Sequence, residues 1–201
     1  MSTVSFTRAD VRTPFATSSV FYNDEQGARA MASSEDFRRT SSPTTMANGA
    51  FTVGLRDESG RFLGGYAANG KEFAVGEAGQ RYTIVLKNDT DLRFEAVVSV
   101  DGLDVMDGRT ASFAKRGYIV DAHRELEVDG FRQSTETVAA FRFGSVKSSY
   151  ANQKHGDTRN VGVIGVALFH ERGTNPFLWA RNDSDRRREA NPFPGRFASP
   201  P

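Results

Sequence analysis

Residues 81–100 decide the fold, and they read RYTIVLKNDTDLRFEAVVSV. Two runs of alternating apolar and polar side chains flank a polar centre at 88–91 (NDTD). The alternating apolar residues are Tyr82, Ile84 and Leu86 in the first run, and Phe94, Ala96, Val98 and Val100 in the second. A period of two is typical of strands that bury one face, and Asn, Asp and Thr are typical of turns. The stretch therefore predicts a central hairpin with these apolar side chains pointing inward.

Similar short runs recur along the middle of the chain. They lie at 51–56, 61–65, 72–75, 103–106, 118–120, 124–128, 137–143 and 161–169, with turn residues between them. Many short strands without helical periodicity are typical of all-β domains. The sequence predicts an antiparallel β-sandwich or jelly roll. One short helix is expected at 24–32, with Asn23 as its N-cap.

Proline and glycine divide the chain into three parts. All seven prolines lie outside residues 51–170, whereas fifteen of the nineteen glycines lie between Gly54 and Gly165. Proline interrupts sheet ladders, and glycine serves turns and bulges. We therefore expect an extended N-terminal arm (1–50), a β-sandwich core domain (51–170) and a C-terminal tail (171–201) that contains Pro, Arg and Phe.

The composition excludes several classes of protein. The 201 residues carry 26 basic and 25 acidic side chains, a net charge of +1, and no cysteine. This rules out disulfides and thiolate metal sites, and it argues against a nucleic-acid partner. No apolar run approaches the roughly 20 residues that span a bilayer, and residues 1–11 lack the apolar stretch of a secretory signal. The expectation is a cytoplasmic protein with no membrane partner.

Two motifs resemble cofactor or metal sites only superficially. Gly162 and Gly165 fall inside an apolar run that no helix follows, so they indicate close packing in a strand rather than a phosphate loop. His123, His155 and His170 lack the spacings that seed a zinc site. No cofactor or resident metal is therefore predicted from these residues.

Acidic residues offer two further candidates. Asp101, Asp104 and Asp107 could supply oxygen ligands to calcium, but the stretch lacks the alternate acidic positions and the terminal Glu of an EF-hand. Aspartate before glycine is typical of hairpin turns, which is the favoured interpretation, and calcium stays open as the alternative. Glu125 and Glu127 share one face of a predicted strand, which suits a solvated sheet face better than the carboxylate pair of a glycosidase.

Basic and nucleophilic signals are weak. Arg181 and residues 186–188 form the dense basic patch, but acidic residues interleave with it, so a solvated or partner-facing tail is the favoured interpretation. No Gly-x-Ser-x-Gly elbow is present. The prediction is a protein that is not an enzyme.

Aromatic side chains in the arm and tail are the main functional clue. They are Phe6, Phe15, Phe21, Phe37, Phe177, Trp179, Phe193 and Phe197. Solvated linkers are poor in aromatics, and burying one Phe contributes roughly 1.5–3 kcal/mol, which helps to offset the ordering of an arm. We expect these residues to be anchors that fill pockets, either in the chain's own core or on a neighbouring subunit.

An ordered series of short motifs covers about residues 81–171. The motifs are 99–103 (SVDGL), 117–120 (GYIV), 131–134 (FRQS), 138–141 (VAAF), 150–151 (YA) and 160–167 (NVGVIGVA). The series resembles a group of uncharacterised bacterial β-rich proteins. The resemblance implies one compact β domain, and it carries over no activity and no catalytic residue.

These features predict a non-enzymatic structural protein whose arms bind neighbouring subunits in a homo-oligomer or larger shell. A phage virion component, such as a minor capsid or decoration protein, is the concrete form. The alternative is a carbohydrate- or ligand-binding β-sandwich module with Tyr66, Tyr118 or Tyr150 as stacking platforms. A hydrolase on a jelly-roll scaffold comes third. Sandwiches host all three, so the fold alone does not choose.

Overall fold

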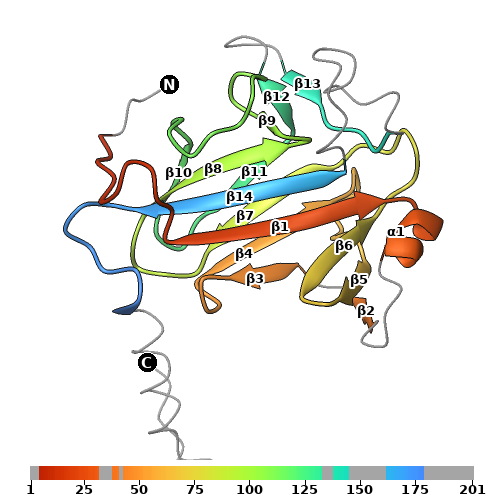
Figure 1. Cartoon of the computed structure of the whole chain (residues 1–201), viewed down its shortest axis with the longest axis horizontal. Coiled ribbons are helices and arrows are strands. Elements are labelled where there is room, and N and C mark those ends of the chain that lie inside the picture. Colours follow the sequence, from red (N-terminus) through yellow and green to blue (C-terminus); the bar gives the residue numbers. More distant parts are fainter. Residues whose placement is uncertain (1–4, 32–37, 41–42, 133–137, 145–161, 179–201) are drawn as a thin grey trace, which may run out of the picture.

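A computed structural model describes residues 5–31, 38–40, 43–132, 138–144 and 162–178 of the chain. Within these ranges the chain forms fourteen strands and one short helix (Figure 1). The prediction of a mostly β protein is confirmed. Among the described residues, no helix is long and apolar enough to cross a membrane.

The larger sheet has eight strands. In hydrogen-bonded order they are β10 (Tyr118–Val120), β8 (Phe94–Val100), β14 (Val163–His170), β1 (Ala16–Asn23), β6 (Lys71–Val75), β5 (Gly65–Ala68) and β2 (Arg38–Thr40), with β9 (Leu103–Asp104) also paired to β8. β1 runs parallel to β6, while the other pairs in this sheet are antiparallel. The sheet is therefore mixed, and the expectation of purely antiparallel pairing is wrong at this one pair. The long connection from β1 to β6, which includes the helix, makes the parallel pairing possible.

Two smaller sheets are antiparallel. The four-stranded sheet has the order β11 (Glu125–Val128), β7 (Thr83–Asn88), β4 (Phe51–Arg56) and β3 (Thr44–Met46). The two-stranded sheet pairs β12 (Gly130–Arg132) with β13 (Val138–Ala140).

Several strands predicted from the sequence are shorter or shifted in the structure. The run at 61–65, for example, contributes only an isolated bridge at Phe62 and the first residue of β5.

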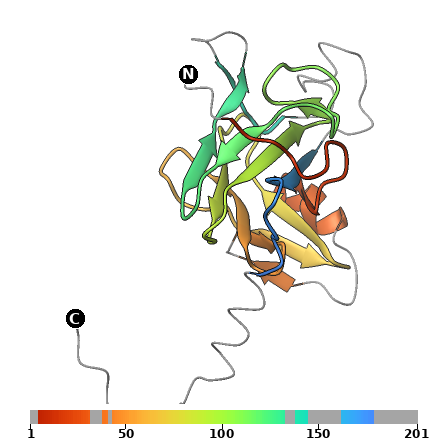
Figure 2. The same ribbon diagram turned by 90° about the vertical axis from the view of Figure 1, so that its left-hand side faces the viewer.

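The eight-stranded and four-stranded sheets bury their inner faces in one shared core (Figure 2). All seven side chains predicted to point inward from residues 81–100 belong to it. Phe51 and Val53 from β4, and Ile164 and Leu168 from β14, are fully buried in the same core. Alternation therefore identified the correct face of both central strands.

The predicted hairpin at 88–91 is wrong, because β7 and β8 belong to different sheets. The buried side chain of Asn88 explains the change of sheet. Its amide nitrogen donates to the carbonyls of Leu92 (2.6 Å) and Asp121 (2.9 Å), and its oxygen accepts from the N–H of Thr90 (3.0 Å). These bonds fix a loop that carries the chain across the core to the other layer.

Part of the expected N-terminal arm is a strand inside the larger sheet. β1 lies between β14 and β6, and its Val20 and Tyr22 point into the core. Because a strand bonded on both sides belongs to the sheet, residues 16–23 are not an extended arm. β3 likewise contributes Met46 to the core. The rest of the predicted tail beyond residue 178 lies outside the described residues.

The short helix α1 (Glu25–Met31) follows β1 as predicted, but its cap lies one residue later. The carboxylate of Asp24 accepts a hydrogen bond from the N–H of Gly27 at 2.7 Å, which is the geometry of an N-cap. Asn23 instead accepts from the N–H of Asp24 at 2.9 Å. The helix therefore begins directly after Asp24.

Candidate functional site

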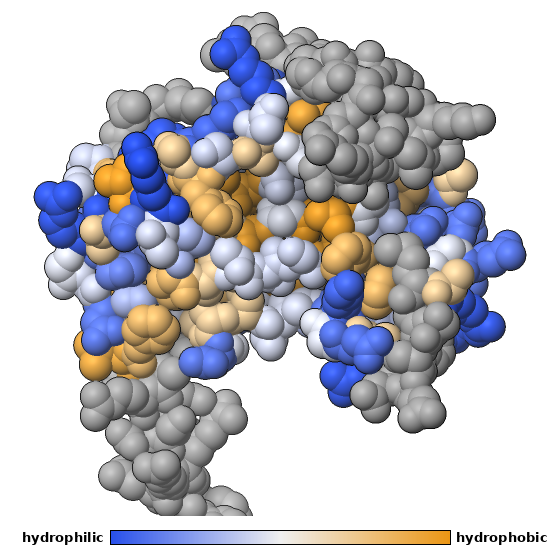
Figure 3. Space-filling view, viewed as in Figure 1, coloured by the Kyte–Doolittle hydropathy of each residue, from blue (hydrophilic) through white to orange (hydrophobic). Residues whose placement is uncertain are grey.

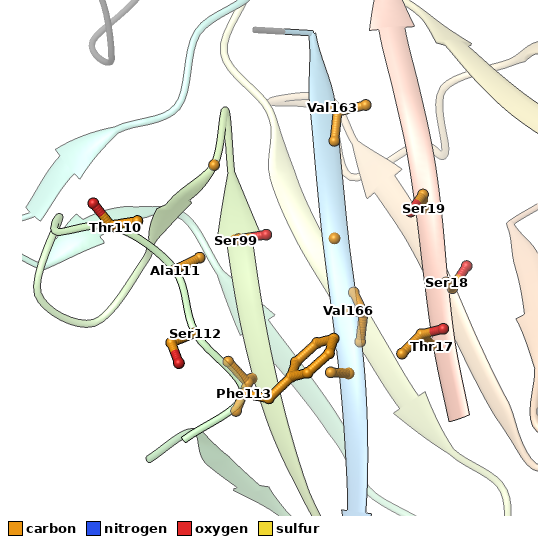
Figure 4. A pocket seen from close by; sticks show the side chains of 14 residues that line it. Thr17, Ser18, Ser19, Ser99, Thr110, Ala111, Ser112, Phe113, Val163 and Val166 are labelled. Carbon is orange, nitrogen blue, oxygen red and sulfur yellow. The ribbon is translucent and has the colours of Figure 1, made fainter. Parts of the chain in front are cut away.

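A groove of about 650 Å³ lies on the outer face of the eight-stranded sheet. Its floor comes from β8, β14 and β1, and one wall comes from residues 110–113 (Figure 4). The space-filling view of this face shows apolar surface interspersed with weakly polar residues (Figure 3). We call this feature the sheet groove.

Strand pairing places small side chains in a row across the floor of the sheet groove. Gly165 of β14 is paired with Ser99 of β8 on one side and with Ser19 of β1 on the other. A Cβ atom at Gly165 would lie only 2.8 Å from the Ser99 hydroxyl oxygen. Because Gly165 has no side chain, the groove stays open between Ser19 and Ser99.

The polar groups of the sheet groove are hydroxyls. Thr17, Ser19, Ser99 and Thr110 line it, and their side-chain hydroxyls make no hydrogen bond with any other described residue. None of the lining residues in the described part of the chain is charged. The groove is thus a neutral surface with unused donors and acceptors.

Phe113 forms the aromatic part of the wall. Its side chain is 49% exposed, and its ring reaches over β14 near Val166 (Figure 4). Its carbonyl accepts a hydrogen bond of 2.6 Å from Arg8. The wall is therefore held through its backbone, while its side chain stays open to solvent.

Arg8 anchors this wall to the sheet. Its guanidinium forms two bonds of 3.0 Å with the carboxylate of Glu95 on β8, and it lies 3.7 Å from the ring centre of Phe169. It also donates to the carbonyls of Val11 and Lys115. Both members of the ion pair are buried, at 2% and 0% side-chain exposure. Arg8 therefore ties the N-terminal segment and the groove wall to one central strand.

Asp101 lies beside Gly102 in the turn after β8 and is not part of the groove lining. Its carboxylate accepts hydrogen bonds from the Tyr22 hydroxyl (2.6 Å) and from the N–H of Gly162 (2.8 Å). Burial raises the pKa of Asp101 above its ordinary range, and burial also raises the pKa of Tyr22. The pair joins β1 to the turn before β14.

The carboxylates of Asp104 and Asp107 accept hydrogen bonds from other groups of this chain. Asp104 accepts from the N–H of Met106 at 2.9 Å, and Asp107 pairs with the ammonium of Lys115 at 2.7 Å. Among the described residues, no three His, Asp or Glu side chains gather closely enough to hold a metal ion. The hairpin-turn interpretation of this stretch thus has structural support, and nothing in the described residues favours the calcium interpretation.

The other sequence candidates are dispersed. Glu125 and Glu127 both pair with Arg56, at 2.6 and 2.8 Å, on the solvated face of the four-stranded sheet. His123 pairs with the exposed Asp91, and His170 lies at the end of β14. His155, Arg181 and residues 186–188 lie outside the described residues. The structure brings none of these described groups into the sheet groove.

The predicted aromatic anchors divide into three groups. Phe6 is buried, Phe15 packs against Phe94 at 5.2 Å, and Phe21 packs against Phe73 at 5.5 Å, all within this chain. Phe177 is exposed. The anchors outside the described residues are Phe37, Trp179, Phe193 and Phe197.

The tyrosines expected as stacking platforms do not line the sheet groove. Tyr66 is buried and its hydroxyl pairs with Glu25, so its ring cannot serve as an exposed platform. Tyr118 is half-buried on β10, and Tyr150 lies outside the described residues. Sequence reasoning missed the groove itself, because its hydroxyls come from strands far apart in the chain.

A second exposed feature surrounds the C-terminal end of β14. Val11, Phe177 and Leu178 expose 61%, 55% and 48% of their surface. Val11 lies in the loop between two backbone bonds to this end of the strand, from Ala9 to His170 and from Phe15 to Leu168. Phe177 stands edge-on to Phe15, with ring centres 6.1 Å apart. We call Val11, Phe177 and Leu178 the end patch.

Comparisons of the chain with protein-family models, curated proteins and solved structures gave no match.

Proposed function

We propose that this chain is a non-enzymatic assembly protein that binds further copies of itself through the end patch. The proposal rests on the concentration of exposed large apolar side chains around one end of β14. Full burial of a large apolar side chain contributes roughly 1.5–3 kcal/mol, and these half-exposed side chains leave a part of that unrealised. Neighbouring exposed apolar side chains, such as Phe177 and Leu178, are typical of protein interaction sites.

A second copy of this chain is the partner that the charge and the chain's course favour. The net charge of +1 means that two copies repel each other only weakly. The described chain ends inside the patch, at Leu178, and continues as Trp179 followed by 22 further residues that include Phe193 and Phe197. Trp179 thus follows Leu178 directly in the sequence, and Phe193 and Phe197 follow farther along it.

The concrete form of the proposal is a phage virion component, such as a minor capsid or decoration protein. The two sheets that share one core support the interpretation of the fold as a β-sandwich. Phe6, Phe15 and Phe21 contribute to the chain's own packing. Partner binding is therefore assigned to Phe177 and Leu178, together with the aromatic residues that follow them.

Light scattering on the purified full-length chain tests the proposal. The wild-type protein is expected to have a mass that is a multiple of the single chain's. The double variant Phe177→Asp/Leu178→Asp is expected to be monomeric, because two charges in an apolar interface stay unpaired. Both side chains are half-exposed, so the circular dichroism spectrum should stay unchanged.

Val138→Asp is the matched control. Val138 is an equally exposed apolar residue (46%), but it lies on β13 in another sheet. This variant is expected to keep the wild-type mass. A wild-type chain that stays monomeric up to high concentration contradicts the proposal, as does a control that dissociates like the double variant.

A further inference from the structure

The sheet groove has the size and the lining of a small-molecule site. Its volume of about 650 Å³ falls in the range of roughly 300–1,000 Å³ that is common for ligand pockets. Val97 and Ala167 supply apolar floor beside the row formed by Ser19, Gly165 and Ser99. Such pockets combine an apolar surface with a few polar groups that orient the ligand.

The polar groups indicate a ligand that is rich in hydroxyls. Each Ser or Thr hydroxyl offers one donor and two acceptor positions. Thr17 and Ser19 on β1, Ser99 on β8 and Thr110 on the wall leave theirs without a partner among the described residues. A ligand that also carries hydroxyls can donate to and accept from all four.

The lining also indicates a ligand without charge. None of the described lining residues is ionisable, so a charged ligand would lose hydration without gaining a counter-charge. Arg8 and Glu95 lie near the wall, but they neutralise each other and are buried. The groove therefore favours neutral over ionic ligands.

Phe113 supplies the apolar contact that such a ligand needs. Its half-exposed ring borders the groove over β14 (Figure 4). Aromatic rings combine a large apolar surface with few rotatable bonds, and the Arg8 bond to the Phe113 carbonyl fixes the backbone from which this ring projects. A side chain with few rotatable bonds on a fixed backbone loses little freedom on binding.

The strands of the floor disfavour a peptide that binds by strand addition. β8, β14 and β1 are all internal to the sheet and are paired on both sides. Strand addition needs an exposed sheet edge with free N–H and C=O groups. The side chains, rather than the backbone, must therefore recognise the ligand.

We propose that the sheet groove binds a neutral saccharide, with one sugar ring against Phe113 and its hydroxyls bonded to Ser19, Ser99 and Thr110. This site shares no lining residue with the end patch, and it does not require self-assembly. A saccharide is the common biological ligand that combines many hydroxyl groups, no charge and an apolar ring face.

An array of neutral and acidic oligosaccharides, probed with the full-length chain, tests the proposal. Glucan, mannan, galactan, xylan and chitin oligosaccharides form the neutral set, and oligogalacturonate forms the acidic set. We expect binding to at least one neutral member. Isothermal titration calorimetry with that oligosaccharide then measures the affinity of each variant.

Phe113→Ala is expected to weaken binding at least about tenfold, because the stacking surface is lost. Ser19→Leu is expected to abolish binding by filling the floor with an apolar side chain. Phe177→Ala is the matched control, since it removes an equally exposed ring outside the groove. Its saccharide affinity is expected to equal that of the wild type.

Three results would overturn the proposal: no binding to any neutral member, stronger binding to oligogalacturonate, or an unchanged affinity in Phe113→Ala. Light scattering distinguishes a failure of the saccharide proposal from a failure of the assembly proposal. Phe113→Ala should keep the wild-type mass, and Phe177→Asp/Leu178→Asp should keep the saccharide affinity.

Discussion

Arg8 and Glu95 form a bidentate ion pair inside the molecule, with both nitrogen–oxygen distances at 3.0 Å. They are 87 residues apart in the chain, and each is almost completely buried. A buried charge is costly unless its partner and its hydrogen bonds are complete. Arg8 meets this condition, because its remaining donors bind the carbonyls of Val11, Phe113 and Lys115.

Replacing Arg8 is therefore expected to destabilise the fold strongly. Arg8→Met removes the bidentate partner of the buried Glu95 carboxylate and leaves only the exposed Arg116, 3.5 Å away, as a counter-charge. Breaking a buried ion pair in this way typically costs about 3–5 kcal/mol. The N-terminal segment and the 110–117 wall lose their common anchor at the same time. Urea denaturation measures the change in the free energy of unfolding.

A double variant separates the unpaired charge from lost packing. Arg8→Met/Glu95→Met removes both charges and keeps apolar volume at both positions, so it should recover most of the stability lost by Arg8→Met. A single variant that loses less than about 1 kcal/mol would contradict the assigned role of this ion pair.

Gly117 is expected to tolerate no side chain. A Cβ atom there would lie 2.1 Å from the carbonyl oxygen of Ala96, on the neighbouring strand. The N–H of Gly117 also donates to Glu95 at 2.6 Å, so β10 cannot move away without breaking this bond. Overpacking of this kind costs about 1–3 kcal/mol, and Gly117→Ala should lose about that much in urea denaturation.

Gly64→Ala provides the comparison for this variant. The nearest atom to a Cβ at Gly64 is the carbonyl oxygen of Thr40, at 3.2 Å, so only a small shift is needed. Its loss of stability should be clearly smaller than that of Gly117→Ala. Equal losses would mean that close approach to Ala96 is not the cause.

Truncation to alanine should lower the free energy of unfolding much more at Phe94 than at Phe113. Phe94 is fully buried, with Phe15 at 5.2 Å and Phe51 at 6.1 Å between ring centres. Phe94→Ala should therefore cost about 3–5 kcal/mol. Phe113 is half-exposed, and Phe113→Ala should cost less than about 1 kcal/mol by the same urea denaturation. A large loss in Phe113→Ala would show that its ring is part of the structural core.

The sequence predicted which side chains face the core but not which strands are neighbours. Alternation in residues 81–100 depends only on local periodicity, so it identified both buried faces correctly. Pairing depends on long-range contacts. The loop around Asn88 reads as a hairpin turn, yet its side chain binds the carbonyl of Asp121, 33 residues away. No local pattern carries that information.

The sheet groove was hidden from sequence reasoning for a related reason. Its floor joins Ser19, Ser99 and Gly165, which meet only through the pairing of β1, β8 and β14. One signal was available: residues 16–23 (ATSSVFYN) contain the β-prone VFY at 20–22, with Val20 and Tyr22 spaced as on one strand face. Such a pattern predicts a strand with a polar face, but it does not predict that the face is hollow.

The pH dependence of stability should reveal the state of Asp101. Burial raises the pKa of this carboxyl above its ordinary value of 3.8, so the folded chain holds the proton more tightly than the unfolded chain does. The protonated carboxyl therefore contributes its full stabilisation of the folded chain below pH 3.8. This contribution is lost as the pH rises through the folded-state pKa of Asp101. The Asp101→Asn variant removes this titration. Asn also suits the positive φ of 56° at this position.

We therefore expect the unfolding free energy of the wild type, minus that of Asp101→Asn, to fall as the pH rises from below 3.8 through the range in which the folded Asp101 carboxyl loses its proton. Asp104 and Glu72 also have raised pKa values, mainly through burial, but they titrate in both proteins and cancel in the difference. Urea denaturation of both proteins across this range measures the difference. A difference that stays constant or increases with pH would show that the Tyr22 and Gly162 hydrogen bonds stabilise the carboxylate more than burial penalises it.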